Sequence, residues 1–345
     1  MRIVITGGAG FLGACLARQL LQIGALSVNG ASVLPVTSLV LIDRVLPPPD
    51  LMSDARVSSV IGDLNALFDP AAHPETMLGS ELAVLFHLAA AVSGECEADF
   101  DLGMRSNVDA TRAVLQACRA LKTQPMVVFA SSLAVFGTSA AQPLPAVIQD
   151  ATLPTPQNSY GIQKFIGEQL VADYGRKGFI NARNVRLMTV SVRPGKPNGA
   201  ASSFLSGMIR EPLAGVRGLC PVPRSMPVAL SSPDRTIEGL LRAATASQAD
   251  WGALTAVNLP AMSTTVGAMA DALARIAGQT CADLIDWAPD PAVTRIVGSW
   301  PATIEATRAR RLGLLPDASI DSLITAYADS LSRSEERRVG KECSS

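Results

Sequence analysis

A tyrosine and a lysine stand four positions apart in the segment SYGIQKFIGEQLVADYG, residues 159–175. The apolar residues of this segment recur at helical spacing, so Tyr160 and Lys164 are predicted to project from one side of a helix, one turn apart. A free phenol has a pKa of about 10, and a neighbouring ammonium lowers that pKa because it stabilises the phenolate. A tyrosine tuned in this way can remove the proton of an alcohol as a general base. The same spacing also occurs in surface pairs without a chemical role, so the hypothesis needs a cofactor and an alcohol close by.

A serine at the end of a predicted strand is the third candidate for this chemistry. The run PMVVFASS, residues 125–132, ends in Ser131 and Ser132 and precedes the helix of the tyrosine. In a doubly wound sheet the carboxyl ends of the strands line the ligand crevice, so Ser132 and the start of that helix are expected to converge. Ser132 could then hydrogen-bond the reacting oxygen, whereas the alternative is a strand-end serine that binds only the backbone.

Three glycines near the N-terminus predict a dinucleotide site. Gly7, Gly10 and Gly13 follow the apolar strand RIVIT (residues 2–6) and open a helix over residues 11–24. Glycines at this place permit a tight turn and a close approach of the backbone to a pyrophosphate, whose charge then faces the free N–H groups of the helix. The position between strand and helix favours this interpretation over an ordinary connecting turn.

Two acids follow at the ends of predicted strands. Asp43 fits the carboxylate that binds the adenosine ribose, although it lies 30 residues after the last glycine of the turn, where about 20 is usual. The turn-rich segment 27–38 is expected to be a loop insertion that explains the excess. A carboxylate at this place favours NAD over NADP because it repels a 2′-phosphate, but the adjacent Arg44 could pair with one. Asp63 could reach the adenine or could only cap a helix.

The order of the predicted elements indicates how these residues come together. Short apolar runs alternate with segments of helix length, which is typical of βαβ units and of a parallel sheet covered on both faces. The predicted strands are residues 2–6, 38–43, 57–63, 82–90, 125–132, a segment within 182–195, and 256–260. The predicted helices are residues 11–24, 104–121, 159–174, 265–278 and two within 300–332. The predicted class is α/β, a Rossmann-type doubly wound parallel sheet with a smaller C-terminal substrate-binding domain.

The composition and periodicity of the sequence also divide the chain into three parts. Residues 1–195 are expected to form the dinucleotide-binding domain, with contributions from about 225–260. Residues 196–332 are expected to form mainly a substrate-binding cap, because 196–235 is rich in proline, glycine and serine and looks like loop. Residues 333–345 are polar and aperiodic and are expected to be a disordered tail.

Composition and charge limit the class of protein. The chain has 345 residues, a net charge of −1, 48% hydrophobic and 17% charged residues, which supports a large core and argues against a nucleic-acid-binding protein. No apolar run approaches about 18 residues and the N-terminus enters a strand directly, so we expect no membrane span and a cytoplasmic location. The six cysteines are scattered and there are two histidines, so no metal site and no disulfide framework is expected. His87 and the three tryptophans are interpreted as core residues.

The glycine turn, the segment SSLAVFG (131–137) and SYGIQK together resemble the extended short-chain dehydrogenase/reductase family over nearly all of residues 1–330. The resemblance implies a Rossmann domain that binds NAD, a C-terminal cap, and a triad of Ser132, Tyr160 and Lys164. Phe136 stands where members often have a tyrosine, which removes one possible substrate contact. The cofactor contacts that the resemblance implies are Gly7, Gly10, Phe11, Leu12, Gly13, Asp43, Asp63, Leu64, Leu88, Ala89, Ser93, Tyr160 and Lys164. It also implies a homodimer, formed through the helix of the tyrosine and the helix near 104–121.

Two stretches, 88–112 and 186–215, resemble members of that family that oxidise the C2 hydroxyl of a four-carbon sugar acid to a ketone with NAD. A sugar acid needs a cation for its carboxylate and polar groups for its hydroxyls. The candidate substrate residues are Ser132, Arg193, Lys196, Ser202, Arg210 and Arg235, with Asn198 and Ser203 near them. For each cation, a solvated or structural role is an equal alternative.

Two other functions remain open from the sequence. A nucleotide-sugar epimerase or dehydratase shares the triad but retains its NAD through the cycle and needs a groove for a nucleotide diphosphate. A non-catalytic NAD-sensing protein would need no triad. Net release of NADH distinguishes the dehydrogenase from the epimerase, and an unchanged function of a Tyr160→Phe variant in cells would support the sensor.

Overall fold

The apolar runs pair as one parallel sheet in the computed structural model, which describes residues 1–197 and 199–342, with side chains to residue 331. Seven strands follow the order β5-β4-β1-β6-β7-β9-β13. Their bounds are β1 Arg2–Thr6, β4 Ser38–Asp43, β5 Val57–Ile61, β6 Leu82–His87, β7 Met126–Ser132, β9 Asn181–Leu187 and β13 Val257–Asn258. Every neighbouring pair is parallel. The predicted α/β, Rossmann-type fold class is therefore confirmed.

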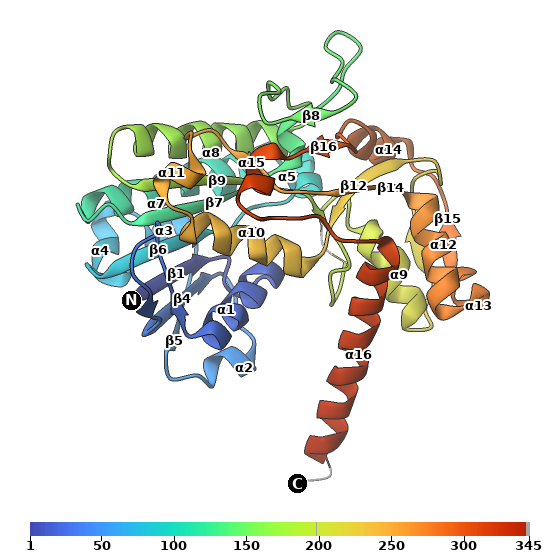
Figure 1. Ribbon diagram of the computed structural model, residues 1–345, viewed down its shortest axis with the longest axis horizontal. Coiled ribbons are helices and arrows are strands. Elements are labelled where there is room, and N and C mark those ends of the chain that lie inside the picture. The colour runs from blue at the N-terminus through green and yellow to red at the C-terminus, as the bar shows by residue number, and fades with distance from the viewer. Residues whose placement is uncertain (198, 343–345) are drawn as a thin grey trace.

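The order of the strands determines where a ligand can bind. β1 lies between β4 and β6, and the chain runs outward from β1 to β5 on one side and from β6 to β13 on the other (Figure 1). At such a reversal the two connections leave on opposite faces of the sheet, and a crevice opens at the carboxyl ends of the strands. The glycine turn after β1 and Ser132 at the end of β7 both lie at that edge.

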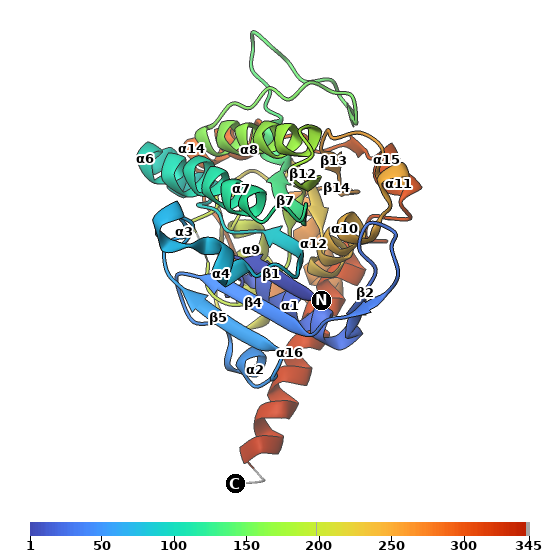
Figure 2. The ribbon, with the colours of Figure 1, turned by 90° about the vertical axis from the view of Figure 1, so that its left-hand side faces the viewer.

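Alternate residues of each strand face two separate apolar cores. Ile3 and Ile5 belong to the cluster that includes side chains of α1 and α10, whereas Val4 belongs to the cluster that includes α7 and α8. Figures 1 and 2 show these two pairs of helices on opposite sides of the sheet. Their bounds are α1 Phe11–Ile23, α7 Ala110–Ala120, α8 Ser159–Arg176 and α10 Pro233–Thr245. The sequence patterns predicted all but α10, whose N-cap Ser232 is followed by Pro233.

A third apolar cluster forms the cap and uses side chains between Val192 and Leu331. The cap elements are β10 Thr189–Val190, α9 Phe204–Leu213, β11 Gly218–Cys220, β12 Pro227–Ser231, β14 Met262–Thr265, α12 Val266–Ala277, α13 Gln279–Ala282, β15 Ile285–Trp287, α14 Pro291–Gly298 and α16 Ile320–Glu342. Residues 196–235 therefore contain a ten-residue helix where loop was expected. The helix α9 even includes Pro212, because its buried side chains, such as Met208 and Ile209, pack in the cap core and outweigh its weak local propensity.

The remaining elements are short and connect these layers. They are β2 Ala25–Leu26, β3 Leu34–Pro35, α2 Pro49–Met52, α3 Leu64–Leu67, α4 Pro74–Leu78, α5 Ser93–Ala98, α6 Phe100–Gly103, β8 Ile148–Gln149, α11 Gln248–Trp251, β16 Ile304–Glu305 and α15 Thr307–Arg311. The single turns Pro70–Ala72 and Leu133–Val135 are 3₁₀ helices, and Met104–Asp109 is π-helical. The strands β2 and β3 form a small antiparallel pair in the region of the expected insertion.

The C-terminal segment differs from the expected disordered tail. The backbone of α16 is helical to Glu342, and Figure 1 shows this helix extending away from the sheet and the cap. The last three positions of the expected tail, 343–345, lie outside the described residues. The helix begins with Ile320 after Ser319, whose Oγ accepts from the nitrogen of Ser322 at 3.0 Å as an N-cap. Its first turns contribute Leu323, Ile324 and Tyr327 to the cap core.

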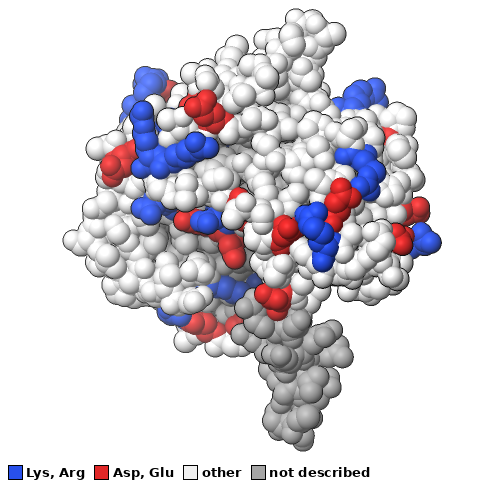
Figure 3. Space-filling model, turned by 45° about the vertical axis from the view of Figure 1, so that its right-hand side comes forward, with Lys and Arg blue, Asp and Glu red and all other residues white. Residues whose placement is uncertain are grey.

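The described surface carries charges of both signs in small groups rather than a broad area of one sign on the face that Figure 3 shows. Within the described residues, no helix is both long and apolar enough to cross a membrane. Cys15, Cys96, Cys118, Cys220 and Cys281 are free thiols, and Cys343 lies outside the described residues.

Candidate functional site

One cavity of about 700 Å³ follows the carboxyl edge of the sheet from β4 and β5 to the cap. It is lined by the glycine turn, by Asp43 and Asp63 at one end, and by Ser132 and Tyr160 further along. The cap closes the other end with residues such as Arg193. Among the described residues that the sequence singled out for cofactor, catalysis or substrate, only Arg235 lies outside this cavity's lining.

The glycine turn is shaped for close approach of an anion. A Cβ on Gly13 would overlap the carbonyl oxygen of Gly7, and a Cβ on Gly7 would lie 2.8 Å from the backbone nitrogen of Ala89. No side chain caps the N-terminus of α1, so the N–H groups of its first turn are free to face a phosphate. Asp43 Oδ2 accepts a hydrogen bond from the backbone nitrogen of Ala9 at 3.0 Å, which ties β4 to the turn. The residues of the turn therefore fit a dinucleotide pyrophosphate.

The acidic end of the cavity contains both acids and Arg44. Asp43 Oδ1 accepts from the backbone nitrogen of Arg44 at 2.7 Å. Asp63 caps α3 by accepting from the nitrogen of Asn65 at 2.9 Å, and its other oxygen lies 3.1 Å from Arg44 Nη2. Asp63 thus caps a helix, lines the cavity and pairs with Arg44 at the same time.

Helix α8 delivers the tyrosine and the lysine to the middle of the cavity. Asn158 begins the helix, because its Oδ1 accepts from the nitrogen of Gly161 at 2.8 Å. Gly161 packs so closely on the turn after β7 that a Cβ there would overlap the carbonyl oxygen of Ala134. Lys164 is buried, and its Nζ donates to the carbonyl oxygen of Ala130 at 2.8 Å and lies 5.8 Å from the centre of the Tyr160 ring.

Burial and the neighbouring groups shift the pKa values of Tyr160 and Lys164 in opposite directions. Burial raises the pKa of Tyr160 to about 12, whereas a hydrogen bond with Ser132 and the charge of Arg193 lower it. Burial also lowers the pKa of Lys164 to about 8. Lys164 Nζ binds the Ala130 carbonyl, and Arg193 is a second cation whose charge lowers the pKa of the phenol.

The hydroxyl of Ser132 makes the backbone contact that the sequence predicted as its alternative role. Its Oγ accepts from the backbone nitrogen of Ala134 at 3.1 Å and so caps the 3₁₀ turn that follows β7. The same hydroxyl lines the cavity with Tyr160, and hydrogen bonding to it lowers the pKa of that phenol. A serine fixed by the backbone on one side can hold a reacting oxygen beside the phenol on the other.

The other expected contacts fall into two groups. Phe11, Leu12, Leu64, Leu88, Ala89 and Ser93 line the cavity along its nucleotide side. Ser93 is buried, and its Oγ accepts from the nitrogen of Ala201 at 3.0 Å, so it also ties α5 to the cap. Lys196, Ser202, Ser203 and Arg210 line the cap end, while Asn198 lies outside the described residues. The expected substrate role of Arg235 is not supported, because this residue pairs with Glu238 along α10 at 2.7 Å, away from the cavity.

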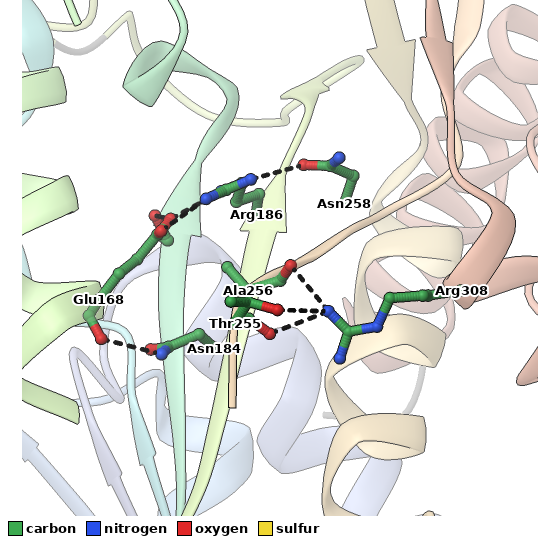
Figure 4. A network of polar contacts seen from close by, with 8 residues as sticks. Glu168, Asn184, Arg186, Thr255, Ala256, Asn258 and Arg308 are labelled. Atoms are coloured by element: carbon green, nitrogen blue, oxygen red, sulfur yellow. Dashed lines mark hydrogen bonds and ion pairs between the residues drawn. The ribbon is translucent and has the colours of Figure 1, made fainter. Parts of the chain in front are cut away.

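A buried polar network that the sequence patterns did not predict lies beneath the catalytic candidates (Figure 4). Glu168 on α8 receives two hydrogen bonds of 2.8 Å from Arg186 on β9. The hydroxyl of Ser131 donates to the same carboxylate at 2.5 Å, and Asn184 Nδ2 donates to the carbonyl oxygen of Glu168 at 3.0 Å. The spacing held a signal, because Glu168 follows Lys164 by four residues on one helix face. The network joins α8, β7 and β9 at one point.

Asn107 is a second residue that the sequence patterns missed. It lies in the π-helical turn before α7 and is buried. Its Oδ1 accepts from the nitrogen of Ala91 at 2.8 Å, and its Nδ2 donates to the carbonyl oxygen of Ala91 at 3.1 Å and to Gln163 at 2.9 Å. Asn107 therefore holds the cavity-lining loop after β6 against α8. A π-turn of this kind often marks a functional region.

Two of the residues interpreted as core, His87 and Trp300, differ in that Trp300 also lines the cavity. His87 is buried between the hydroxyls of Thr6 and Thr111, at 2.6 and 3.0 Å, and burial lowers its pKa to about 3, so it is the satisfied neutral histidine that was expected. Trp300 packs against the cores of both the sheet and the cap but also lines the cavity. Its packing was predicted, whereas its place in the cavity was not.

The doubly wound sheet, the glycine turn and the cavity that holds a phenol beside it define a dinucleotide-binding α/β enzyme. The chain belongs to the NAD dependent epimerase/dehydratase family, whose profile matches residues 3–223.

Similar proteins cover nearly the whole chain. A D-erythronate dehydrogenase of Cupriavidus necator is 49% identical over 329 residues, which are 95% of this chain and 98% of that protein. A D-erythronate dehydrogenase of Haemophilus influenzae is 38% identical over 330 residues, 95% of this chain and 99% of that protein. A crystal structure described as a nucleoside-diphosphate-sugar epimerase from Agrobacterium tumefaciens is 38% identical, with a TM-score of 0.85 and coverage of 95% of this chain and 94% of that one.

The buried network predicts a large loss of stability when its carboxylate is removed. Glu168→Gln leaves the buried guanidinium of Arg186 without a counter-charge, so the free energy of unfolding in urea should fall by about 3–5 kcal/mol. The matched control is Arg18→Met, which breaks the exposed pair with Asp50 and should cost less than about 1 kcal/mol. Equal losses in the two variants would contradict the assigned role of the network.

Proposed function

We propose that this protein is an NAD-dependent dehydrogenase that oxidises the C2 hydroxyl of D-erythronate to give 2-dehydro-D-erythronate. The observation that carries the proposal is that one cavity brings together the phenol of Tyr160, the hydroxyl of Ser132 and the glycine turn. The names of the two relatives at 49% and 38% identity support the choice of substrate, because each covers nearly all of this chain. The cations at the cap end of the cavity support an acidic substrate.

NAD is the nicotinamide cofactor that the acidic end of the cavity fits. Asp43 lines the cavity at the end of β4, where its carboxylate would bind the ribose hydroxyls and repel a 2′-phosphate. Arg44 is the cation there that could attract such a phosphate, but its guanidinium is paired with Asp63 at 3.1 Å. The two acids and one arginine leave this end with an excess of negative charge, which favours NAD over NADP.

The residues of the chain account for the proton of the reaction. Tyr160, as phenolate, takes the proton from the C2 hydroxyl, and Ser132 holds the oxygen that becomes the carbonyl. NAD, when bound, supplies the acceptor for the hydride that leaves C2 and, in its oxidised form, a positive charge. Lys164, whose ammonium donates to the carbonyl of Ala130, would bind the nicotinamide ribose. The positive charge of Arg193 lowers the pKa of Tyr160 and so favours the phenolate that the oxidation needs.

An epimerase acting on a nucleotide sugar is the second candidate. The observation that favours it is the 38% identical structure described as a nucleoside-diphosphate-sugar epimerase. Such an enzyme would return the hydride to its substrate and release no NADH. The protein would then require room for a nucleotide diphosphate at the cap end.

The direct test is turnover with a panel of four- and five-carbon aldonates and one UDP-hexose, each with NAD or NADP, followed by nicotinamide absorbance. We expect stoichiometric NADH with D-erythronate and at least about tenfold lower kcat/KM with NADP. Epimerised sugar without NADH would establish the second candidate. Absence of turnover on every aldonate would remove the proposed activity.

The pKa of Tyr160 predicts how the oxidation depends on pH. Only the deprotonated phenol accepts a proton, and its pKa is raised to about 12, so kcat for oxidation should increase from pH 7 to pH 10. Because the hydrogen bond from Ser132 lowers that pKa, Ser132→Ala should shift the rising limb to higher pH and reduce kcat at pH 8 by about 10- to 100-fold. A pH profile identical to that of the wild type would contradict the role of Ser132. In Tyr160→Phe, the increase of kcat with pH should disappear.

We also propose a homodimer formed through α7 and α8, and a cytoplasmic location. The exposed Ile162 on α8, with 46% of its surface accessible, supports an apolar contact there. The five described free thiols support a reducing compartment. Sedimentation velocity should give twice the chain mass for the wild type and a single chain for Ile162→Glu, whereas a monomeric wild type would contradict the dimer.

A further inference from the structure

We propose that the guanidinium of Arg193 binds the carboxylate of the substrate and so selects acids whose reacting hydroxyl is next to that carboxylate. The identity of the substrate in this inference rests on the proposed function, whereas its chemical class, a 2-hydroxy acid, does not. Arginine is suited to this task because its planar fork makes two parallel hydrogen bonds to one carboxylate.

Most cations of the cavity already have another partner. Arg44 at the nucleotide end is paired with Asp63, and Lys164 donates to the carbonyl oxygen of Ala130. Arg210 at the cap end is buried, and its guanidinium donates to the carbonyl oxygen of Arg193 at 2.8 Å and to Glu211 at 2.5 Å. The side chains of these three cations therefore already have protein partners, which makes them poorer ligands for a substrate carboxylate.

Two cations of the lining have side chains with no hydrogen bond or ion pair to any described residue, namely Arg193 and Lys196. Lys196 is exposed to solvent, which hydrates its ammonium and screens its charge. Arg193 is partly buried, and both burial and the neighbouring Arg210 lower the pKa of its guanidinium. A partly desolvated cation beside a second cation gains most from an incoming anion. The cavity therefore favours an anion at Arg193.

The position of Arg193 relative to Tyr160 identifies the class of anion. Arg193 and Tyr160 line the same cavity, and each charge shifts the pKa of the other group. In a 2-hydroxy acid the reacting hydroxyl is one carbon away from the carboxylate, so one small molecule can reach both groups. A hydroxyl far from the acid, or a neutral polyol, would satisfy only one of them.

The backbone of Arg193 is held on both sides, which gives the side chain a fixed origin. Its nitrogen donates to Ser206 Oγ at 3.0 Å, and its carbonyl oxygen accepts from Arg210 at 2.8 Å. Ser206 and Arg210 both lie on α9, the buried helix of the cap. Arg210 therefore acts as a positioning residue, and α9 places the anion-binding guanidinium against the phenol.

The test compares Arg193→Met with Arg193→Lys and with Arg235→Met, which removes an arginine outside the cavity. Binding of D-erythronate and of its neutral C1 amide to the NADH-loaded protein is measured by calorimetry, and kcat/KM is measured with NAD. Arg193→Met should weaken D-erythronate binding and lower kcat/KM by about 100-fold or more, with little effect on the amide or on NADH affinity. Arg193→Lys should recover part of the loss, and Arg235→Met should behave as the wild type.

Each outcome separates this inference from the proposed function. Aldonate binding that depends on Arg193 without any turnover would leave the inference standing and remove the proposed activity. Turnover of D-erythronate that Arg193→Met reduces no more than Arg235→Met would overturn the inference and leave the activity. Equal losses for the acid and the amide would also overturn it, because they would indicate a structural role.

Discussion

A buried carboxylate between one helix and two strands is the constraint on which the site depends. Glu168 binds Arg186 of β9 through two hydrogen bonds and Ser131 of β7 through a third, at positions shielded from solvent. Because a buried charge without its partner is costly, α8 can dock on the sheet in one register only. That register places Tyr160 two turns earlier on the helix, beside Ser132 at the end of β7. The glycine at 161 permits the close contact that completes the docking.

Burial and the neighbouring groups act in opposite directions on the pKa of Tyr160, and a bound substrate and cofactor would change that balance. Burial raises the pKa of Tyr160 and lowers that of Lys164, so each group is held nearer its neutral form than in water. Arg193 and Ser132 oppose the effect on the phenol. An anionic substrate and an oxidised nicotinamide would add one negative and one positive charge to this balance. The acidity of Tyr160 would therefore depend on whether substrate and nicotinamide are bound in the cavity.

Local patterns in the sequence were sufficient for the strands of the seven-stranded sheet, the glycine turn, the helix that carries Tyr160 and Lys164, and the strand-end position of Ser132, because each depends on residues close together along the chain. They were not sufficient for contacts between distant segments. The pairing of Arg235 with Glu238, the binding of Lys164 to Ala130 and the ion pair of Glu168 are set by tertiary packing. Helix α9 was not predicted for the same reason, because its buried side chains pack on distant segments of the cap core.

The most direct test of the account follows the hydrogen on C2 in a single turnover of D-erythronate deuterated at that carbon. The account predicts one deuterium in the NADH per ketone formed, with transfer slowed by about 10²- to 10⁴-fold in Tyr160→Phe although nucleotide affinity is unchanged. Deuterium that appears in solvent or stays in the sugar acid, or transfer at the wild-type rate without the phenol, would contradict it.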